Sequence, residues 1–237
     1  MASTNHEQDS YVFNRDHKST VRIWPLELSR ELPGTARIDG FDISPAQYPH
    51  RNWLPANVIL YVHNAFAPFP QEYAGVYDVV HVRFFVTLIN EENVAGFIQN
   101  LMALLKPGGY LQWVDLDPHS CCAVTAVPES PKNATEKLVA LMQKPHPDAN
   151  YSWVPKLTET ASLLGLQVQT RDNISMKDEF RPFWNQSNLL GVEDFGSQME
   201  GEAAKEASRM IKTLGEEFSK GASVEAEFLC LVGVRPL

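Results

Sequence analysis

The sequence predicts a doubly wound α/β fold with a mostly parallel sheet. Two observations support this prediction. Short apolar strand candidates alternate with helix candidates through the first half of the chain, and glycine and proline residues mark the boundaries between them. The 237 residues are enough for one domain with a substantial core, and 44% hydrophobic and 21% charged residues is an ordinary globular composition.

Each element of the first half follows from a local pattern. Residues 36–44 form a short strand that stops at an acidic residue, and residues 57–66 form an apolar strand after a loop rich in proline and tryptophan. Residues 77–89 predict a strand that continues into a loop or helix. The segment 92–106 predicts a helix, which the glycines of 107–109 end before a strand over 110–117. The apolar stripe of that helix is Val94, Phe97, Ile98, Leu101, Leu104 and Leu105.

The second half is less regular. The patterns predict helices over 133–144, 154–166 and 201–221, and strands over 167–176 and 225–236. We expect the last strand to be antiparallel, at the edge of the sheet. The expected organisation is a flexible arm over 1–18 and one domain over 19–237, with a helical lid and substrate region at about 119–200.

Charge and composition narrow the classes of partner and compartment. A formal net charge of −9 argues against binding to nucleic acid or to an anionic membrane surface, because both would repel the protein. The N-terminus has no apolar signal-peptide core, and no apolar run is long enough to predict a membrane span. Three cysteines make no disulfide framework, so we expect a cytoplasmic protein, with the nucleus left open.

Three segments resemble the class I S-adenosylmethionine (SAM)-dependent methyltransferases, and most closely the LaeA-type group of fungal secondary metabolism. They are "GFDIS", "HNAFAPFPQEYAGVYDVVHVRFF" and "LLKPGGYLQWVDLDP", in the order and spacing of that family. The resemblance covers about residues 23–117 and, more loosely, the C-terminal part. It implies the Rossmann-like methyltransferase fold with a small helical lid. It also implies SAM as the cofactor, if any cofactor binds.

One part of the family pattern is missing from the sequence. In the family a G-x-G-x-G loop follows the first strand and lets the backbone approach SAM closely. The thirteen glycines here form no G-x-G pair, and "STVR" directly precedes "IWPLELSRELP". The central strand and its loop therefore look deleted near residue 22. If nothing replaced the missing strand, the sheet would have a gap of roughly 10 Å at that position.

Two explanations of this deletion remain open. In the first, the scaffold is repaired: residues 19–24 form the replacement strand, and Pro25 begins a helix over 25–32. In the second, the sequence reflects an aberrant gene model or splice product. In either case the resemblance implies that the remaining site residues would bind SAM weakly.

The cofactor candidates follow the second and third strands of the family pattern. Asp42 matches the acid that bonds the ribose, and its alternative role is an Asx-turn or helix cap. Asn64, with Ala65 beside it, occupies the position of the residue that accepts from the adenine amino group. The alternative for Asn64 is a turn residue after a buried strand.

The substrate and catalytic candidates lie further along the chain. Arg83, Trp113 and Asp115 lie near the carboxyl ends of strands, where ligands of open α/β sheets bind, although Arg83 could instead form a surface ion pair. His119 is a candidate general base or a solvated loop histidine, and His81 is expected to be a core histidine. The aromatic candidates of the lid, which could equally form a small satellite core, are Trp153, Phe183 and Trp184.

We expect no metal site, because Cys121 and Cys122 beside His119 supply at most half of one. Three functions then compete. The first is an active methyltransferase acting on an aromatic metabolite. The second is a methyltransferase-like protein that acts on or protects an aromatic intermediate without efficient methyl transfer, in some cases for a second pathway enzyme. The third is a regulatory or scaffold pseudoenzyme. The missing glycine loop argues against the first function, and the retained strand-end residues and aromatic lid favour the second over the third.

Overall fold

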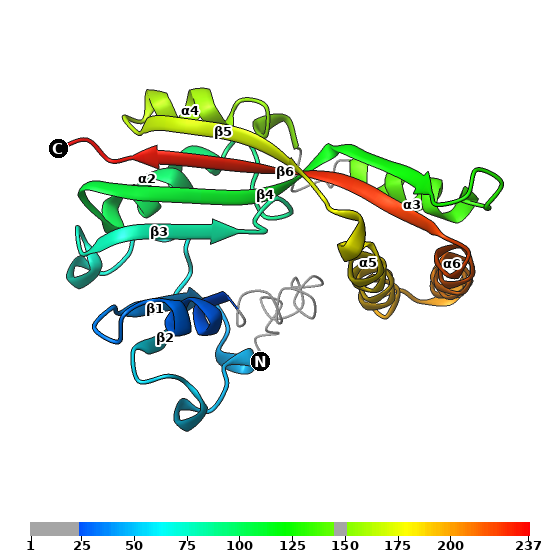
Figure 1. Cartoon of the computed structure of the whole chain (residues 1–237), viewed down its shortest axis with the longest axis horizontal. Helices are drawn as coiled ribbons and strands as arrows, with labels where there is room; N and C mark the ends of the chain where they lie inside the picture. The colour runs from blue at the N-terminus through cyan, green and yellow to red at the C-terminus, as the bar shows by residue number, and fades with distance from the viewer. Residues whose placement is uncertain (1–23, 145–150) are drawn as a thin grey trace, which may run out of the picture. The chain divides into compact units, whose positions relative to one another are not determined.

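The computed structural model describes residues 24–144 and 151–237, which form two compact units (Figure 1). We call the described residues of 22–120, 144–175 and 226–237 the sheet unit. We call the described residues of 121–143 and 176–225 the helical unit. The predicted arm over 1–18 lies outside the described residues.

The sheet unit begins with a helical segment over 24–31 and a two-stranded parallel sheet. The sheet pairs β1 (Ile38–Asp42) with β2 (Val58–Val62), in a register that places Asp42 opposite Val62. Between these strands lie two single-turn helices, η1 (Pro45–Gln47) and η2 (Arg51–Trp53). The chain after β2 includes a third, η3 (Gln71–Tyr73).

The second sheet has four strands in the order β3-β4-β6-β5 (Figure 1). β3 (Tyr77–Arg83) is parallel to β4 (Leu105–Thr125), and β5 (Gln167–Ser175) is antiparallel to β6 (Ala222–Val234). The α/β fold is confirmed, and the closing strand β6 is antiparallel to β5 as expected. Its predicted position at the edge of the sheet is wrong, because β6 lies between β4 and β5, and β5 is at the edge. The last residues of β4 and the first of β6 fall in the helical unit.

No described strand lies between β1 and β3, so each is hydrogen-bonded to strands on one side only within the described part of the chain. Side chains connect β3 to β1 and to the helical segment 24–31 instead. The Tyr77 hydroxyl donates to Asp39 Oδ2 at 2.7 Å, and the Trp24 ring stacks on His81 with centroids 4.1 Å apart. The prediction of a strand over 19–24 is wrong at Trp24, which is helical because Pro25 favours a first helical turn, and residues 19–23 lie outside the described part.

The core of the sheet unit lies against α2 (Val94–Leu104). All six residues of the predicted stripe are buried, although Leu105 belongs to β4 rather than to the helix. The buried Trp113 ring contacts Phe97 at 5.3 Å between centroids and Trp153 at 5.5 Å. Trp153 belongs to η4 (Tyr151–Trp153), which precedes α4 (Leu157–Leu163).

β4 is longer than the predicted strand over 110–117. Its glycines do not separate helix from strand, because the Gly108 N–H donates to Arg235 O at 2.8 Å and the Arg235 N–H donates to Gly109 O at 2.9 Å. These bonds join the glycines to the chain just after β6. Beyond the predicted end, the Glu227 N–H donates to Ser120 Oγ at 2.8 Å. Long-range pairing therefore extends β4 at both ends.

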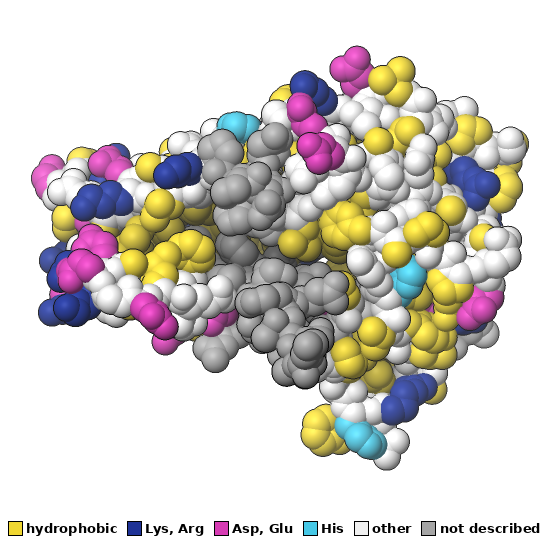
Figure 2. Space-filling view, turned by 180° about the vertical axis from the view of Figure 1, so that it is seen from behind, with side chains coloured by type: hydrophobic (Ala, Val, Ile, Leu, Met, Phe, Trp, Pro, Cys, Tyr) yellow, Lys and Arg dark blue, Asp and Glu magenta, His cyan; other side chains and the backbone are white. Residues whose placement is uncertain are grey.

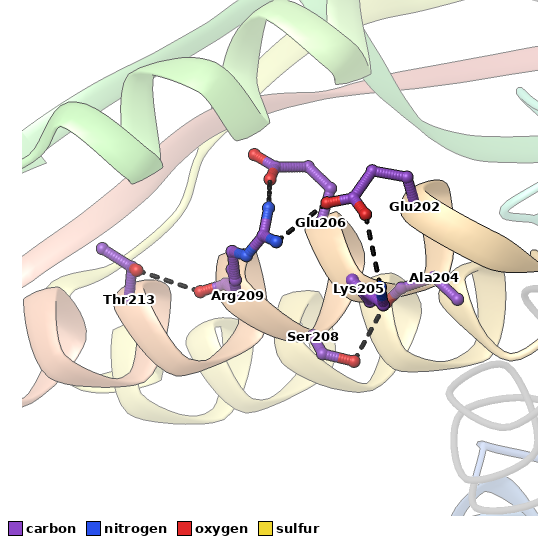
Figure 3. Close-up of polar contacts among 7 residues, drawn as sticks. All are labelled: Glu202, Ala204, Lys205, Glu206, Ser208, Arg209 and Thr213. Carbon is purple, nitrogen blue, oxygen red and sulfur yellow. Dashed lines mark hydrogen bonds and ion pairs between the residues drawn. The ribbon is translucent and has the colours of Figure 1, made fainter.

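The helical unit contains α3 (Asn133–Gln143), η5 (Asp178–Phe180), α5 (Arg181–Gly196) and α6 (Gly201–Ser219). The sequence patterns did not predict α5, because its apolar residues have no helical stripe and it contains proline and glycine. On the outer face of α6, Arg209 pairs with Glu202 at 2.8 Å and with Glu206 at 2.9 Å (Figure 3). These side chains are exposed, so the pairs add little stability.

Gly233 of β6 is required by close packing. A Cβ placed there would lie 2.6 Å from Cγ of the buried Leu166, and closer still to its Cδ2. We expect Gly233→Ala to lower the free energy of unfolding by about 1–3 kcal/mol, because both the strand and Leu166 are held in the core. Urea unfolding followed by tryptophan fluorescence measures the change.

Gly215 of α6 provides the matched control, because a Cβ there would meet nothing within 4 Å. Gly215→Ala should leave stability unchanged or raise it by about 0.5–1 kcal/mol, since alanine favours helix more than glycine does. If Gly233→Ala were as stable as the wild type, the packing of Leu166 would be adjustable and the explanation would be wrong.

The surface of the described residues carries mixed charge. Figure 2 shows acidic and basic side chains interspersed with hydrophobic ones on the displayed face. In the described part of the chain, no helix is both long enough and apolar enough to cross a membrane. The same residues contain no group of three or more histidine, cysteine, aspartate or glutamate side chains that could hold a metal ion.

Candidate functional site

The two cofactor candidates lie at the same edge of the small parallel sheet. Asp42 ends β1, Asn64 follows the end of β2, and the His63 N–H donates to Asp42 O at 2.8 Å. Parallel pairing brings the carboxyl ends of both strands together, and this is the edge where open α/β sheets bind ligands. Ala65 is held nearby, because its carbonyl accepts from Asn100 Nδ2 at 3.1 Å.

Both candidates also make the local turns that were their alternative roles. Asp42 Oδ1 accepts from the Ser44 N–H at 2.9 Å, and Asn64 Oδ1 accepts from the Phe66 N–H at 3.0 Å. Each bond fixes the direction of a side chain that has further lone pairs. A turn and a ligand contact are therefore compatible at both positions.

The residues present fit one half of SAM. A carboxylate and an amide oxygen at adjacent strand ends suit the ribose diol and the adenine amino group. Tyr48 stabilises this end of the sheet: its hydroxyl donates to Tyr61 O at 2.6 Å, and burial, with the nearby Asp42 charge, raises its pKa to about 12. For the methionine half, the described residues offer no glycine turn beside β1. The described residues therefore account for contacts to the nucleoside half alone.

Arg83 and Phe84 lie at the carboxyl end of β3. Phe84 has a φ of 59°, a left-handed conformation that is strained for a bulky residue and that often marks a functional site. The Arg83 guanidinium lies 4.6 Å from the centre of the Phe84 ring. Its Nε is buried without a hydrogen-bond partner among the described residues. Burial lowers the pKa of Arg83, and the charge of Asp115 opposes this effect.

Asp115 is fully buried and anchors the turn that follows β3. Its Oδ2 accepts from the Phe85 N–H at 2.8 Å and from Trp113 Nε1 at 3.0 Å, and its Oδ1 accepts from the Leu116 N–H at 3.0 Å. Burial raises the pKa of Asp115 to about 6, although the hydrogen bonds favour the carboxylate. Trp113 and Asp115 thus belong to the core, where they position the edge that carries Arg83. Direct substrate contact by these two residues stays a prediction.

The two histidines are in different environments. His81 lies in β3, with Nδ1 2.9 Å from Gln112 Oε1 and its ring stacked on Trp24, and burial lowers its pKa. These contacts are those of a core histidine. His119 is exposed in β4, its N–H donates to Asp117 Oδ1 at 3.0 Å, and its ring centroid lies 6.3 Å from that of Tyr151. A catalytic role for His119 stays a prediction.

The three aromatic candidates fall in different units. Trp153 is buried in the sheet unit, whereas Phe183 and Trp184 lie in α5 of the helical unit, where Phe183 is exposed. A shared substrate surface therefore stays a prediction. Sequence reasoning missed the strained Phe84, because a phenylalanine at positive φ has no sequence signal. It also missed the bond between Tyr77 and Asp39, which depends on two strands that are distant in sequence.

This geometry defines the fold of the chain. The Rossmann-like fold of the class I methyltransferases is confirmed. The described chain resembles the solved structure of the [4+2]-cyclase SpnF with a TM-score of 0.53 at 14% identity, over 90% of this chain and 70% of that one. It resembles phosphoethanolamine N-methyltransferase 2 from Haemonchus contortus with a TM-score of 0.51 at 13% identity, over 98% of this chain and 58% of that one.

The sequence is similar to fungal methyltransferases over part of its length. It is 42% identical over 82 residues to methyltransferase grgD of a Penicillium species, covering 35% of this chain and 28% of that protein. It is 34% identical over 102 residues to N-methyltransferase tcpN of Claviceps purpurea, covering 43% and 35%. These alignments span about a third of each relative's length. No family model matches the chain.

Proposed function

We propose that this chain is a LaeA-type methyltransferase-like protein of fungal secondary-metabolite biosynthesis. It binds an aromatic small-molecule intermediate and either acts on it or protects it. It does so without efficient methyl transfer. A second enzyme of the pathway can be its partner. The similarity to fungal methyltransferases supports the methyltransferase-like class.

One observation supports the proposal that methyl transfer is inefficient. Asp42 and Asn64 meet at one strand edge and suit an adenosine, while the described residues lack the turn that would hold methionine. A site that keeps the nucleoside half of SAM without the methionine half cannot orient a methyl donor. A fold alone does not fix chemistry, and one protein of this fold is described as a cyclase.

An active SAM-dependent methyltransferase is the second candidate. The observation that favours it is the sequence similarity to proteins described as N-methyltransferases, including verN of Clonostachys rogersoniana, which is 32% identical over 100 residues. In that case the chain would bind SAM much more tightly than adenosine, because the methionine half would add contacts.

Isothermal titration with SAM, S-adenosylhomocysteine and adenosine separates the two candidates. Under the first proposal all three ligands bind within about threefold of one another, since the methionine half adds less than about 1 kcal/mol. Asp42→Ala should weaken all three by about tenfold or more, because the ribose loses a charged acceptor. Asp78→Ala is the control, because the Asp78 side chain is exposed and pairs with Lys106 away from this edge.

Each other outcome has a definite meaning. SAM binding that is about a hundredfold tighter than adenosine binding would make methyl transfer the leading function. No binding of any of the three up to millimolar concentration would remove the nucleoside site. Equal loss in Asp42→Ala and Asp78→Ala would show that charge in general, and not the strand edge, controls binding.

A further inference from the structure

The Arg83 guanidinium lies at the carboxyl end of β3 and lacks hydrogen-bond partners for its charge among the described residues. Its side chain is half-buried, its Nε is buried without a partner, and none of its nitrogens forms an ion pair with a described residue. Arginine keeps its charge under all ordinary conditions, and an unpaired buried donor is unfavourable. Such a group in a native structure requires an explanation.

The nearest acid cannot supply that partner. Asp115 attracts Arg83 electrostatically, but its oxygens accept from the Trp113 indole and from the N–H groups of Phe85 and Leu116, not from Arg83. It therefore reduces the cost of keeping Arg83 charged without taking up the hydrogen bonds of the guanidinium.

Aromatic side chains lie beside the cation. The Phe84 ring contacts the Arg83 guanidinium, and the Phe228 ring of β6 meets Phe84 edge to face, with centroids 6.0 Å apart. The strained backbone of Phe84 holds its ring in this place. The arrangement combines a planar hydrogen-bonding fork with flat apolar surface, as recognition of a planar anionic ligand requires.

We infer that Arg83 binds the carboxylate of an aromatic acid, with the aromatic ring of the ligand against Phe84 and Phe228. The inference rests on the proposed function for its setting and names the substrate class: an aromatic carboxylic acid rather than a neutral aromatic compound. The carboxylate would accept from the two Nη groups of Arg83, because Nε itself is buried and out of a ligand's reach.

The test uses benzoate as the probe, with benzamide as its neutral counterpart and inorganic phosphate as an anion without a ring. Two-dimensional ¹H–¹⁵N spectra of the full chain report on the Arg83 Nε–H, identified by its loss in Arg83→Lys. We expect benzoate to shift this resonance and to bind about tenfold or more tightly than benzamide or phosphate. Arg83→Met should weaken benzoate by about tenfold or more.

Arg171→Met is the matched control, because Arg171 is an exposed arginine of β5 and its loss changes the net charge equally. This variant should bind benzoate like the wild type. Arg83→Lys should bind benzoate at an intermediate level, since it keeps the charge but not the fork. The wild-type Nε–H shift supports the inference even if Arg83→Met fails to fold.

Three results would overturn the inference: an Nε–H resonance that benzoate leaves unmoved, benzamide binding equal to benzoate binding, or phosphate binding equal to benzoate binding. Failure here is distinguishable from failure of the proposed function. The titrations with adenosine and SAM depend on Asp42, so they can succeed while benzoate fails, and the reverse also holds.

Discussion

Replacing Asp115 by alanine is expected to lower the free energy of unfolding by about 3 kcal/mol or more, because three donors lose their acceptor at once. Asp115→Asn should cost less, about 2 kcal/mol, because one amide oxygen remains while the amide nitrogen faces an N–H group. Urea unfolding at pH 7, followed by near-ultraviolet circular dichroism, measures both changes. Asp78→Asn, at an exposed acid of the same unit, should change stability little.

Asp115 also predicts a pH dependence. Burial raises its pKa from the ordinary 3.8 to about 6 in the folded protein, so the native state binds the proton more tightly than the unfolded state does. The contribution of this group to stability is therefore complete below about pH 4 and falls as pH rises through 6, by roughly 3 kcal/mol.

The difference between the wild type and Asp115→Asn isolates this contribution. The wild type should lose stability relative to the variant as pH rises from 4 to 6, whereas Asp78→Asn should follow the wild type. Parallel curves for the wild type and Asp115→Asn would show that the hydrogen bonds hold the carboxylate at its ordinary pKa. The explanation by burial would then be wrong.

Glu217→Gln is expected to lower the free energy of unfolding by about 2 kcal/mol. Glu217 of α6 is 4% exposed and serves as a cap for α3. Its carboxylate accepts from the Ala134 N–H at 2.9 Å and from the N–H and Oγ1 of Thr135, both at 2.8 Å. Glutamine has one acceptor oxygen, so its amide nitrogen would face a donor at the positive end of a helix.

The pH dependence of Glu217 has the opposite sign to that of Asp115. Burial alone would raise the pKa of Glu217, but the bonds from the first turn of α3 outweigh it, and the net shift is downward. Its contribution is therefore present above pH 4.5 and lost as pH falls below that value. The neighbouring Glu216 is exposed, so Glu216→Gln is the control and should keep the acid dependence of the wild type. A Glu217→Gln protein that also keeps it would contradict the capping role.

Local patterns predicted most elements of the fold. The stripe of α2 was found because helical spacing places all its apolar residues on one face, and that face is buried whatever it packs against. The extent of β4 was not found, because bonds to Arg235 and Glu227, more than a hundred residues away, decide it. α5 was missed because it has no apolar stripe, and its contacts with α6 and β6 hold it in place.

At the candidate site the sequence determined which side chains reach the ligand edge. Asp42 and Arg83 end strands, Asn64 follows one, and parallel pairing brings such ends to one edge of each of the two sheets. Only the tertiary structure decided their surroundings. The left-handed Phe84, the hydrogen bonds of the buried Asp115 and the unpartnered Nε of Arg83 arise from contacts between separate strands and loops, and local sequence does not encode such contacts.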